Sequence, residues 1–245
     1  SYLGSRQDGG FAEYVAVPIR NVLELSENVS FEQAAMLEPM SVAIHAIRRT
    51  EVKQTDTVVV YGLGTIGLLL VMFLLEQGVQ NIVAVGNKSA QKEAVLQLGL
   101  SESNFCNCKE IDVQDWMKKQ GNQNGADVVF ECVGKIETLS QAVSLATISG
   151  KICTVGNPDT DMTLEKDIYW KILRNQLTII GTWNSSFFKL CEEDISDWEY
   201  VLAKLKEGKI SPQQLITHRF SIGDLEHGVH IMRDKTEDYV KIMMV

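Results

Sequence analysis

Between residues 57 and 183, short apolar runs alternate with longer segments of helical periodicity. The apolar runs are rich in Val and Ile and predict strands at Val58–Tyr61, Asn81–Val85, Asn104–Cys106, Asp127–Cys132, Lys151–Val155 and Leu177–Ile180. The segments between them predict helices at Thr65–Gln77, Ala90–Leu98, Ile111–Lys119, Ile136–Ala146 and Lys166–Arg174. Because these strands are apolar throughout rather than alternating, helices should cover both faces of their sheet. Such a series of β-α units predicts an α/β fold, a Rossmann doubly wound parallel sheet.

The two ends of the chain do not show this alternation of strands and helices. Residues 1–40 predict one strand, at Ala12–Val17. Residues 185–245 predict a helix, a strand, a helix and a final strand, at Asp194–Glu207, Ile216–Phe220, Gly223–Arg233 and Val240–Val245. Neither end is expected to enclose a core alone. We therefore expect residues 41–184 to form the main domain, and residues 1–40 and 185–245 to build a second, smaller domain together.

Charge and composition narrow the choice of partners. The 245 residues carry a formal net charge of −9, so neither nucleic acid nor a membrane surface is an expected partner. The longest apolar stretch, Ile66–Leu75, is far shorter than the roughly 20 residues of a membrane span. The chain opens on Ser1 without a signal-peptide pattern, which favours a fragment of a longer protein.

The cysteines indicate the redox compartment. There are five of them, and none forms a C-x-x-C pair: Cys106, Cys108, Cys132, Cys153 and Cys191. We expect buried free thiols rather than disulfides, which is typical of a reducing environment. This predicts a cytoplasmic protein.

A glycine-rich turn follows the first strand of the series. Gly62, Gly64 and Gly67 stand in a G-x-G-x-x-G pattern between a buried strand and an apolar helix. In such a turn the first glycine permits the bend, the second lets a diphosphate approach the backbone, and the third lets helix and strand pack closely. The helix begins at Thr65 and Ile66, whose free amide groups would face the diphosphate. In this setting the pattern predicts a dinucleotide-binding site.

The end of the second strand bears on which dinucleotide binds. An NAD site usually has an acidic residue about 20 residues beyond the glycines, where it holds the ribose 2′-hydroxyl. Here Gly86, Asn87 and Lys88 follow the strand, and no carboxylate is present. A glycine should leave room for a 2′-phosphate that Lys88 and Asn87 could bind. NADP is therefore the predicted cofactor, and NAD, with Lys88 as a solvated lysine, is the alternative.

Three blocks of this sequence together resemble the zinc-containing medium-chain alcohol and polyol dehydrogenases. They are Gly9–Val15, Glu38–Ala46 and Gly62–Leu68, and they occur in the order that the family shows. The segments Lys171–Asn175 and Gly181–Trp183 are similar to the polyol branch, which includes sorbitol and galactitol-1-phosphate 5-dehydrogenases.

The resemblance implies a GroES-like catalytic domain that this chain holds only in part. Its zinc site, in the full-length enzyme, would take about three protein ligands. Glu38 is the one matching residue of this chain, as a catalytic carboxylate that either ligates zinc or holds the zinc-bound water. From the residues alone, Glu38 has a second interpretation, an acid favoured by the dipole at a helix start. The other ligands are expected in a segment before Ser1.

The resemblance also implies roles for other residues. Strands four and five end in loops that relatives place around the adenosine and nicotinamide, and the residues concerned are Cys132, Val133, Val155, Gly156 and Asn157. Arg174 matches an arginine that reaches the cofactor phosphates in relatives, or else it is a cation at a helix end. Lys241 resembles a family lysine. His45 is interpreted as a packed core histidine rather than a catalytic one.

These inferences predict an oxidoreductase. The expected reaction is hydride transfer between a secondary alcohol, a polyol or polyol phosphate, and the nicotinamide ring, with zinc polarising the alcohol oxygen. Relatives imply a homodimer or homotetramer. Two alternatives stay open: a dinucleotide-binding fragment without turnover, and a zinc-free quinone or enoyl reductase. The acidic Glu38 argues against the second, because hydride transfer without metal has no use for it.

Overall fold

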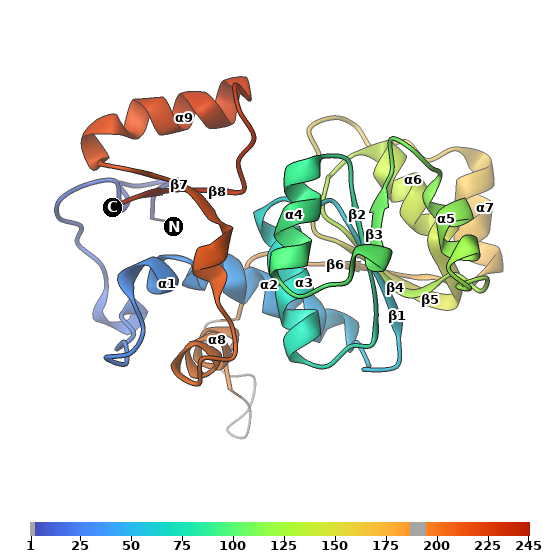
Figure 1. Ribbon diagram of the computed structural model, residues 1–245, viewed down its shortest axis with the longest axis horizontal. Coiled ribbons are helices and arrows are strands. Elements are labelled where there is room, and N and C mark those ends of the chain that lie inside the picture. The colour runs from blue at the N-terminus through green and yellow to red at the C-terminus, as the bar shows by residue number, and fades with distance from the viewer. Residues whose placement is uncertain (1–2, 187–194) are drawn as a thin grey trace.

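The computed structural model describes residues 3–186 and 195–245. Its centre is a six-stranded parallel sheet in the order β3-β2-β1-β4-β5-β6 (Figure 1). The strands are β1 (Thr57–Tyr61), β2 (Asn81–Gly86), β3 (Phe105–Asn107), β4 (Ala126–Glu131), β5 (Ala146–Thr154) and β6 (Thr178–Gly181). This strand order is that of a Rossmann fold, with the order reversing between β1 and β4. The predicted fold class is confirmed.

Both faces of the sheet are covered by helices, as the continuous apolar runs required. Val58 and Val60 of β1 join one core, and Val59 and Tyr61 join the other. The first core packs α2 (Leu37–Thr50), α3 (Thr65–Glu76), α4 (Ser89–Gln97) and α8 (Asp197–Lys206). The second packs α5 (Val113–Lys119), α6 (Ile136–Leu145) and α7 (Lys166–Arg174). Alternate residues of one strand thus face different apolar cores. This explains why the strand sequences are apolar throughout and do not alternate between polar and apolar residues.

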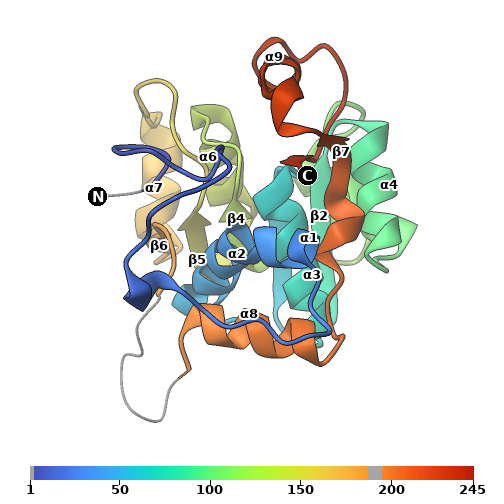
Figure 2. The ribbon, with the colours of Figure 1, turned by 90° about the vertical axis from the view of Figure 1, so that its left-hand side faces the viewer.

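The flanking segments lie beside this sheet rather than within it. They contribute α1 (Phe31–Ala35), α9 (Leu225–Asp234) and a parallel pair of strands, β7 (Ile216–Phe220) and β8 (Lys241–Met244). Figure 1 shows α9, β7 and β8 on the opposite side of the molecule from α5, α6 and α7. Figure 2 shows α8 running beneath α2. The helix α2 spans the predicted domain boundary at residue 40, so the two parts of the chain share one continuous helix.

Short 3-10 turns join these elements, at Ile19–Asn21, Glu102–Asn104, Pro212–Leu215 and Ile222–Asp224. None of the helices in the described part of the chain is both long and apolar enough to cross a membrane. The thiols of Cys106, Cys108, Cys132 and Cys153 are free, and Cys106 and Cys153 are buried. Cys191 lies outside the described residues.

Two predicted strands differ from the structure. Residues 12–17 form no strand and are exposed, because no strand of the described chain pairs with them. β5 begins at Ala146, directly after α6, and its pairing with β4 shifts between Ala126 and Val128. The shift accommodates Ser149, whose φ of 63° takes it out of the regular ladder. The helix predicted from Asp194 begins at Asp197, and Asp194 itself lies outside the described residues.

Candidate functional site

The turn between β1 and α3 needs its glycines for two separate reasons. Gly62 has a φ of 97°, and a Cβ there would lie 2.5 Å from Cγ2 of Val133. A Cβ on Gly67 would lie 1.9 Å from the carbonyl oxygen of Gly62, so the helix could not pack so closely on the strand. Both glycines are therefore required by the protein itself.

Gly64 is different, because no protein atom requires it. Its φ of −81° suits any residue, and a Cβ there would have no neighbour within 4 Å. Gly64 is also the N-cap of α3, and no side chain caps the helix. Within the described residues, the first amide groups of α3, at Thr65 and Ile66, consequently have no N-cap side chain as a hydrogen-bond acceptor. A space bordered by backbone donors and kept free of a side chain fits a diphosphate.

The end of β2 meets this turn through Gln91. The Gln91 amide donates from Nε2 to the Leu63 carbonyl oxygen at 3.2 Å and accepts from the Asn87 amide at Oε1 at 2.9 Å. A Cβ on Gly86 would lie 2.7 Å from that Oε1. The space beside Gly86 is therefore occupied by the end of the flexible Gln91 side chain, which its two hydrogen bonds hold there.

Lys88 is not a free cation. Its Nζ lies 2.5 Å from Oδ1 of Asp238, which stands 150 residues further along the chain. Both side chains are about half exposed, at 48% and 53%. Next to this pair, the Thr65 hydroxyl donates to the Val240 carbonyl oxygen at 2.5 Å. The C-terminal segment thus lies against the starts of both α3 and α4.

The loops after β4 and β5 complete this edge of the sheet. A Cβ on Gly134 would lie 2.1 Å from the Asn157 carbonyl oxygen, and one on Gly156 would lie 2.2 Å from the Gly134 amide nitrogen. The two loops therefore pack directly on each other, while Val133 packs on Gly62. This brings together the predicted residues of the turn and of both loops, with Cys132 and Val155 at the strand ends. Burial raises the pKa of the Cys132 thiol well above its ordinary value.

Glu131 holds the β4 loop in place, and sequence reasoning did not single it out. Its side chain is 1% exposed, yet no cation pairs with it in the described part of the chain. Its carboxylate accepts from the Val133 amide at 2.8 Å, the Gly134 amide at 3.0 Å and the Thr138 hydroxyl at 2.7 Å. These charge-assisted hydrogen bonds satisfy the buried carboxylate and fix the loop that packs on Gly62.

Arg174 does not join this group, which corrects its predicted role. It ends α7, and the chain then returns to the start of β6, at the amino edge of the sheet. The two edges are separated by the length of the strands, about 20 Å for the six residues of β4. Arg174 instead borders a groove with Gln114 and Ser144.

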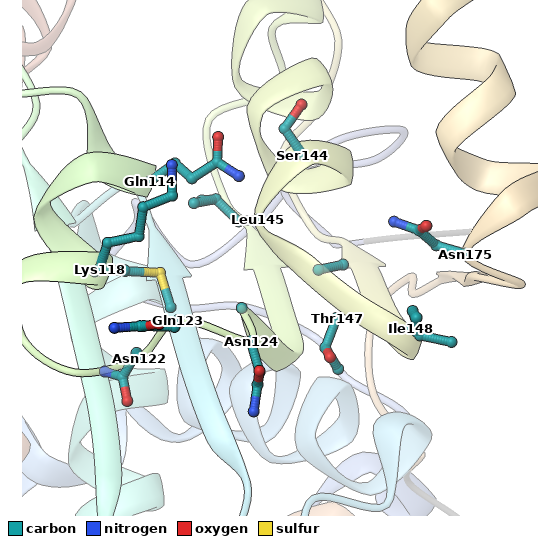
Figure 3. A pocket seen from close by; sticks show the side chains of 13 residues that line it. Gln114, Lys118, Asn122, Gln123, Asn124, Ser144, Leu145, Thr147, Ile148 and Asn175 are labelled. Atoms are coloured by element: carbon teal, nitrogen blue, oxygen red, sulfur yellow. The ribbon is translucent and has the colours of Figure 1, made fainter.

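That amino edge carries a polar pocket of its own, with a volume of about 200 Å³ (Figure 3). Carboxamide and hydroxyl side chains line it, among them Gln114, Asn122, Asn124, Ser144, Thr147 and Asn175. Among the described residues that line it, none belongs to the glycine turn at 62–67. It is therefore distinct from the carboxyl edge, where ligands of doubly wound sheets bind.

Glu38 lies in the first turn of α2, as its helix-start interpretation required. Desolvation by surrounding atoms raises the pKa of its carboxyl, and the positive charge of Lys241 lowers it by a smaller amount. The described residues contain no group of three His, Cys, Asp or Glu side chains that could hold a metal ion. Glu38 alone does not make a zinc site.

His45 is a structural residue. Its Nδ1 lies 2.9 Å from Oδ2 of Asp197, the first residue of α8, and Arg48 Nη1 lies 2.8 Å from the other oxygen. Asp197 is 1% exposed and accepts in addition from the Ser186 amide at 2.6 Å. These contacts join α2 to α8, and the His45 side chain is 21% exposed, so it lies at the edge of the core rather than within it.

The strand order and the helices on both faces define a Rossmann-type α/β architecture. Comparison with known proteins identifies the family to which the chain belongs. Residues 65–207, more than half of the chain, match the family described as zinc-binding dehydrogenase. The chain belongs to the zinc-binding dehydrogenase family.

Individual relatives are polyol dehydrogenases. The chain is 28% identical to a sorbitol dehydrogenase of Halalkalibacterium halodurans, over 99% of this chain and 67% of that protein. It is 29% identical to galactitol 1-phosphate 5-dehydrogenase of Escherichia coli, over 95% of this chain and 65% of that protein. The crystal structure of galactitol-1-phosphate dehydrogenase from Escherichia coli superposes with a TM-score of 0.86 at 28% identity, covering 98% of this chain and 69% of that one. The chain thus spans about two thirds of the length of these relatives.

Proposed function

We propose that the chain binds a nicotinamide dinucleotide at the carboxyl edge of its six-stranded sheet and forms the cofactor-binding part of an alcohol or polyol dehydrogenase. Gly64 carries this proposal. The protein's own packing explains Gly62 and Gly67, but it leaves Gly64 unexplained, since a Cβ there would have no atom of the described residues within 4 Å. A ligand that approaches the backbone at Gly64 supplies the missing reason.

Different residues of this edge would bind different parts of the dinucleotide. The amides of Thr65 and Ile66 at the start of α3 would bind the diphosphate, while Asn87 and Lys88 lie where the adenosine ribose would be placed. The loops with Cys132, Val133, Val155, Gly156 and Asn157 would border the rest of the dinucleotide. When bound, the nicotinamide ring supplies the hydride acceptor of the reaction.

The proposed substrate is a secondary alcohol, a polyol or a polyol phosphate. This rests on the likeness to a sorbitol dehydrogenase and to a galactitol 1-phosphate 5-dehydrogenase, at 28% and 29% identity. Zinc dependence of the whole enzyme is proposed on the same ground. The described residues do not provide a zinc ligand set. For the 245-residue chain by itself we expect cofactor binding without polyol oxidation.

NADP is proposed as the cofactor, with NAD as the alternative. In favour of NADP, no acidic residue ends β2, and Lys88 follows Gly86 and Asn87. The Gln91 amide beside Gly86 offers both a donor and an acceptor, which would suit a ribose hydroxyl as well as a phosphate. A homodimer or homotetramer, with a small-molecule alcohol as partner, completes the proposal.

The decisive experiment is the substitution Gly64→Ala. It introduces a methyl group into open space at a φ that Ala accepts, so the thermal midpoint should stay within about 2 °C of the parent. Affinity for NADH and NADPH, measured by fluorescence titration, should fall at least about tenfold, because the methyl group would occupy the closest approach of the diphosphate.

Gly223→Ala is the matched control, since Gly223 belongs to the 3-10 turn at Ile222–Asp224 and a Cβ there would meet the Ser221 hydroxyl at an ordinary 3.5 Å. Its affinity and stability should equal those of the parent. If the parent chain binds neither dinucleotide at millimolar concentration, or if Gly64→Ala binds as well as the parent, the proposed site is wrong.

A further inference from the structure

The region around Lys88 contains a carboxylate that local sequence does not reveal. The expected acid at the end of β2 is missing, yet Asp238 brings its side chain to within 2.5 Å of Lys88 Nζ from the segment before β8. Lys88 follows the end of β2, where a 2′-phosphate would bind if the proposed function holds. Its charge is therefore already engaged when that phosphate arrives.

The position of Asp238 is fixed by its neighbours in the chain. Two residues later, Val240 is 8% exposed, accepts from the Thr65 hydroxyl at 2.5 Å, and donates its amide to the Thr217 hydroxyl at 3.1 Å. These bonds hold the 238–240 segment against the start of α3. Asp238 consequently remains near Lys88 even when another anion competes for the ammonium.

The pair is also weak enough to be opened. Its two side chains are 48% and 53% exposed, and ion pairs of this kind gain little over their solvated partners. A phosphate dianion can therefore replace Asp238 as the ion-pair partner of Lys88. The phosphate then lies beside the unpaired, negatively charged carboxylate of Asp238, which repels it. A 2′-hydroxyl meets no such repulsion and can donate to the carboxylate.

We propose that Asp238 is a specificity-determining residue of the cofactor site, which lowers affinity for the 2′-phosphorylated dinucleotide relative to NAD by occupying Lys88. This inference rests on the proposed function. Asp238 would thus reduce, without abolishing, the preference for the 2′-phosphorylated dinucleotide that Lys88 would otherwise give.

The test compares dissociation constants of NADH and NADPH for the parent chain, Asp238→Asn, Lys88→Ala and the double variant. Asp238→Asn should tighten NADPH binding about fivefold, the size of an exposed charge interaction, and change NADH binding less than about twofold. Lys88→Ala should weaken NADPH alone. In the Lys88→Ala background, Asp238→Asn should have a clearly different effect on NADPH than in the parent, because the two residues act through their pair.

Glu237→Gln is the matched control, since it removes one neighbouring negative charge that faces His218 at 3.6 Å rather than Lys88. The NADPH-to-NADH ratio should not change in this variant, and the shift in Asp238→Asn should diminish with added salt. Equal changes for both dinucleotides in Asp238→Asn, or an equal shift in the control, would overturn the inference while leaving the proposed function intact. Failure of the parent chain to bind either dinucleotide would overturn both.

Discussion

Glu131 is a buried carboxylate whose charge is stabilised by hydrogen bonds rather than by a cation of the described chain. Its three donors are the Val133 and Gly134 amides and the Thr138 hydroxyl. Glu131→Ala would leave the buried Gly134 amide and the part-buried Val133 amide without this acceptor, so we expect it to lower the free energy of unfolding by about 2–3 kcal/mol. Urea denaturation of the two proteins measures this difference.

Thr138→Val tests the same network from the other side. It removes one donor and keeps the side-chain shape, so its loss should be smaller than that of Glu131→Ala. Both variants should also weaken dinucleotide binding if the β4 loop borders the cofactor. An unchanged unfolding free energy in Glu131→Ala would mean that the loop is held by other contacts.

Two buried thiols give a second prediction for single residues. Burial raises the pKa of Cys106 to about 12, with a smaller contribution from Cys108 and Asp112. Burial likewise raises the pKa of Cys153 to about 12, against a small opposite effect of Arg49. Because the thiolate is the reactive form, neither residue should be alkylated by iodoacetamide at about pH 8 in the native chain.

The measurement is mass spectrometry of alkylated peptides before and after denaturation. Both cysteines should be labelled only after unfolding, and the partly exposed Cys108 provides an internal comparison. Rapid labelling of Cys153 in the native chain would contradict its burial within the first core.

At the scale of elements, the contact between α2 and α8 depends on Asp197. Burial by itself raises the pKa of this carboxyl, but the hydrogen bonds of His45 and Ser186 and the charge of Arg48 hold it below its ordinary value of 3.8. A folded pKa below the unfolded one means that the carboxylate stabilises the fold above about pH 4, and that this stabilisation is lost as pH falls through the folded pKa.

Asp197→Asn should therefore lower the free energy of unfolding by about 1–3 kcal/mol at neutral pH. The difference between the two proteins should shrink as pH is lowered below about 4, which urea titrations at several pH values would measure. The exposed Asp161→Asn serves as the control and should show no such convergence. A constant difference at all pH values would argue against the ionised carboxylate as the cause.

The strand-like runs that pair in the structure were predictable from sequence, whereas whether a given run finds a partner strand was not. The strands of the Rossmann sheet are marked by continuous apolar runs, and β7 was predicted at its observed bounds, Ile216–Phe220. Residues 12–17 have strand-like composition, but a strand forms only where another strand pairs with it. Likewise, no local pattern reveals that Ser149 leaves the β5 ladder.

The candidate site likewise has features that could be predicted from sequence and features that could not. The glycines of the turn are recognisable because their spacing is local. The Lys88–Asp238 pair spans 150 residues and depends on how the C-terminal segment docks, which sequence spacing does not encode. Arg174 was misplaced for a related reason: similarity of a short block says nothing about which edge of the sheet its helix end reaches.

At the scale of the whole molecule, the two edges of the sheet offer two different environments. The carboxyl edge combines the glycine turn, the loops and the C-terminal segment, and the amino edge holds the polar pocket of Figure 3. A ligand that binds only the folded chain adds stability in proportion to the logarithm of its concentration. NADH or NADPH at about 100 times its dissociation constant should raise the free energy of unfolding by about 2.7 kcal/mol.

Hydrogen exchange decides which edge is responsible for that stabilisation. Bound dinucleotide should slow exchange of amides in residues 62–68, 86–88, 132–134 and 155–157, and also in the 238–241 segment that the Thr65 hydroxyl holds to the turn. Amides of residues 122–125 and 147–148, which line the amino-edge pocket, should gain only the general protection shared by the whole core. Because both sets belong to one sheet, the pocket acts as an internal reference. Preferential protection there would show that the dinucleotide binds at the amino edge, and the assignment of the glycine turn would then be wrong.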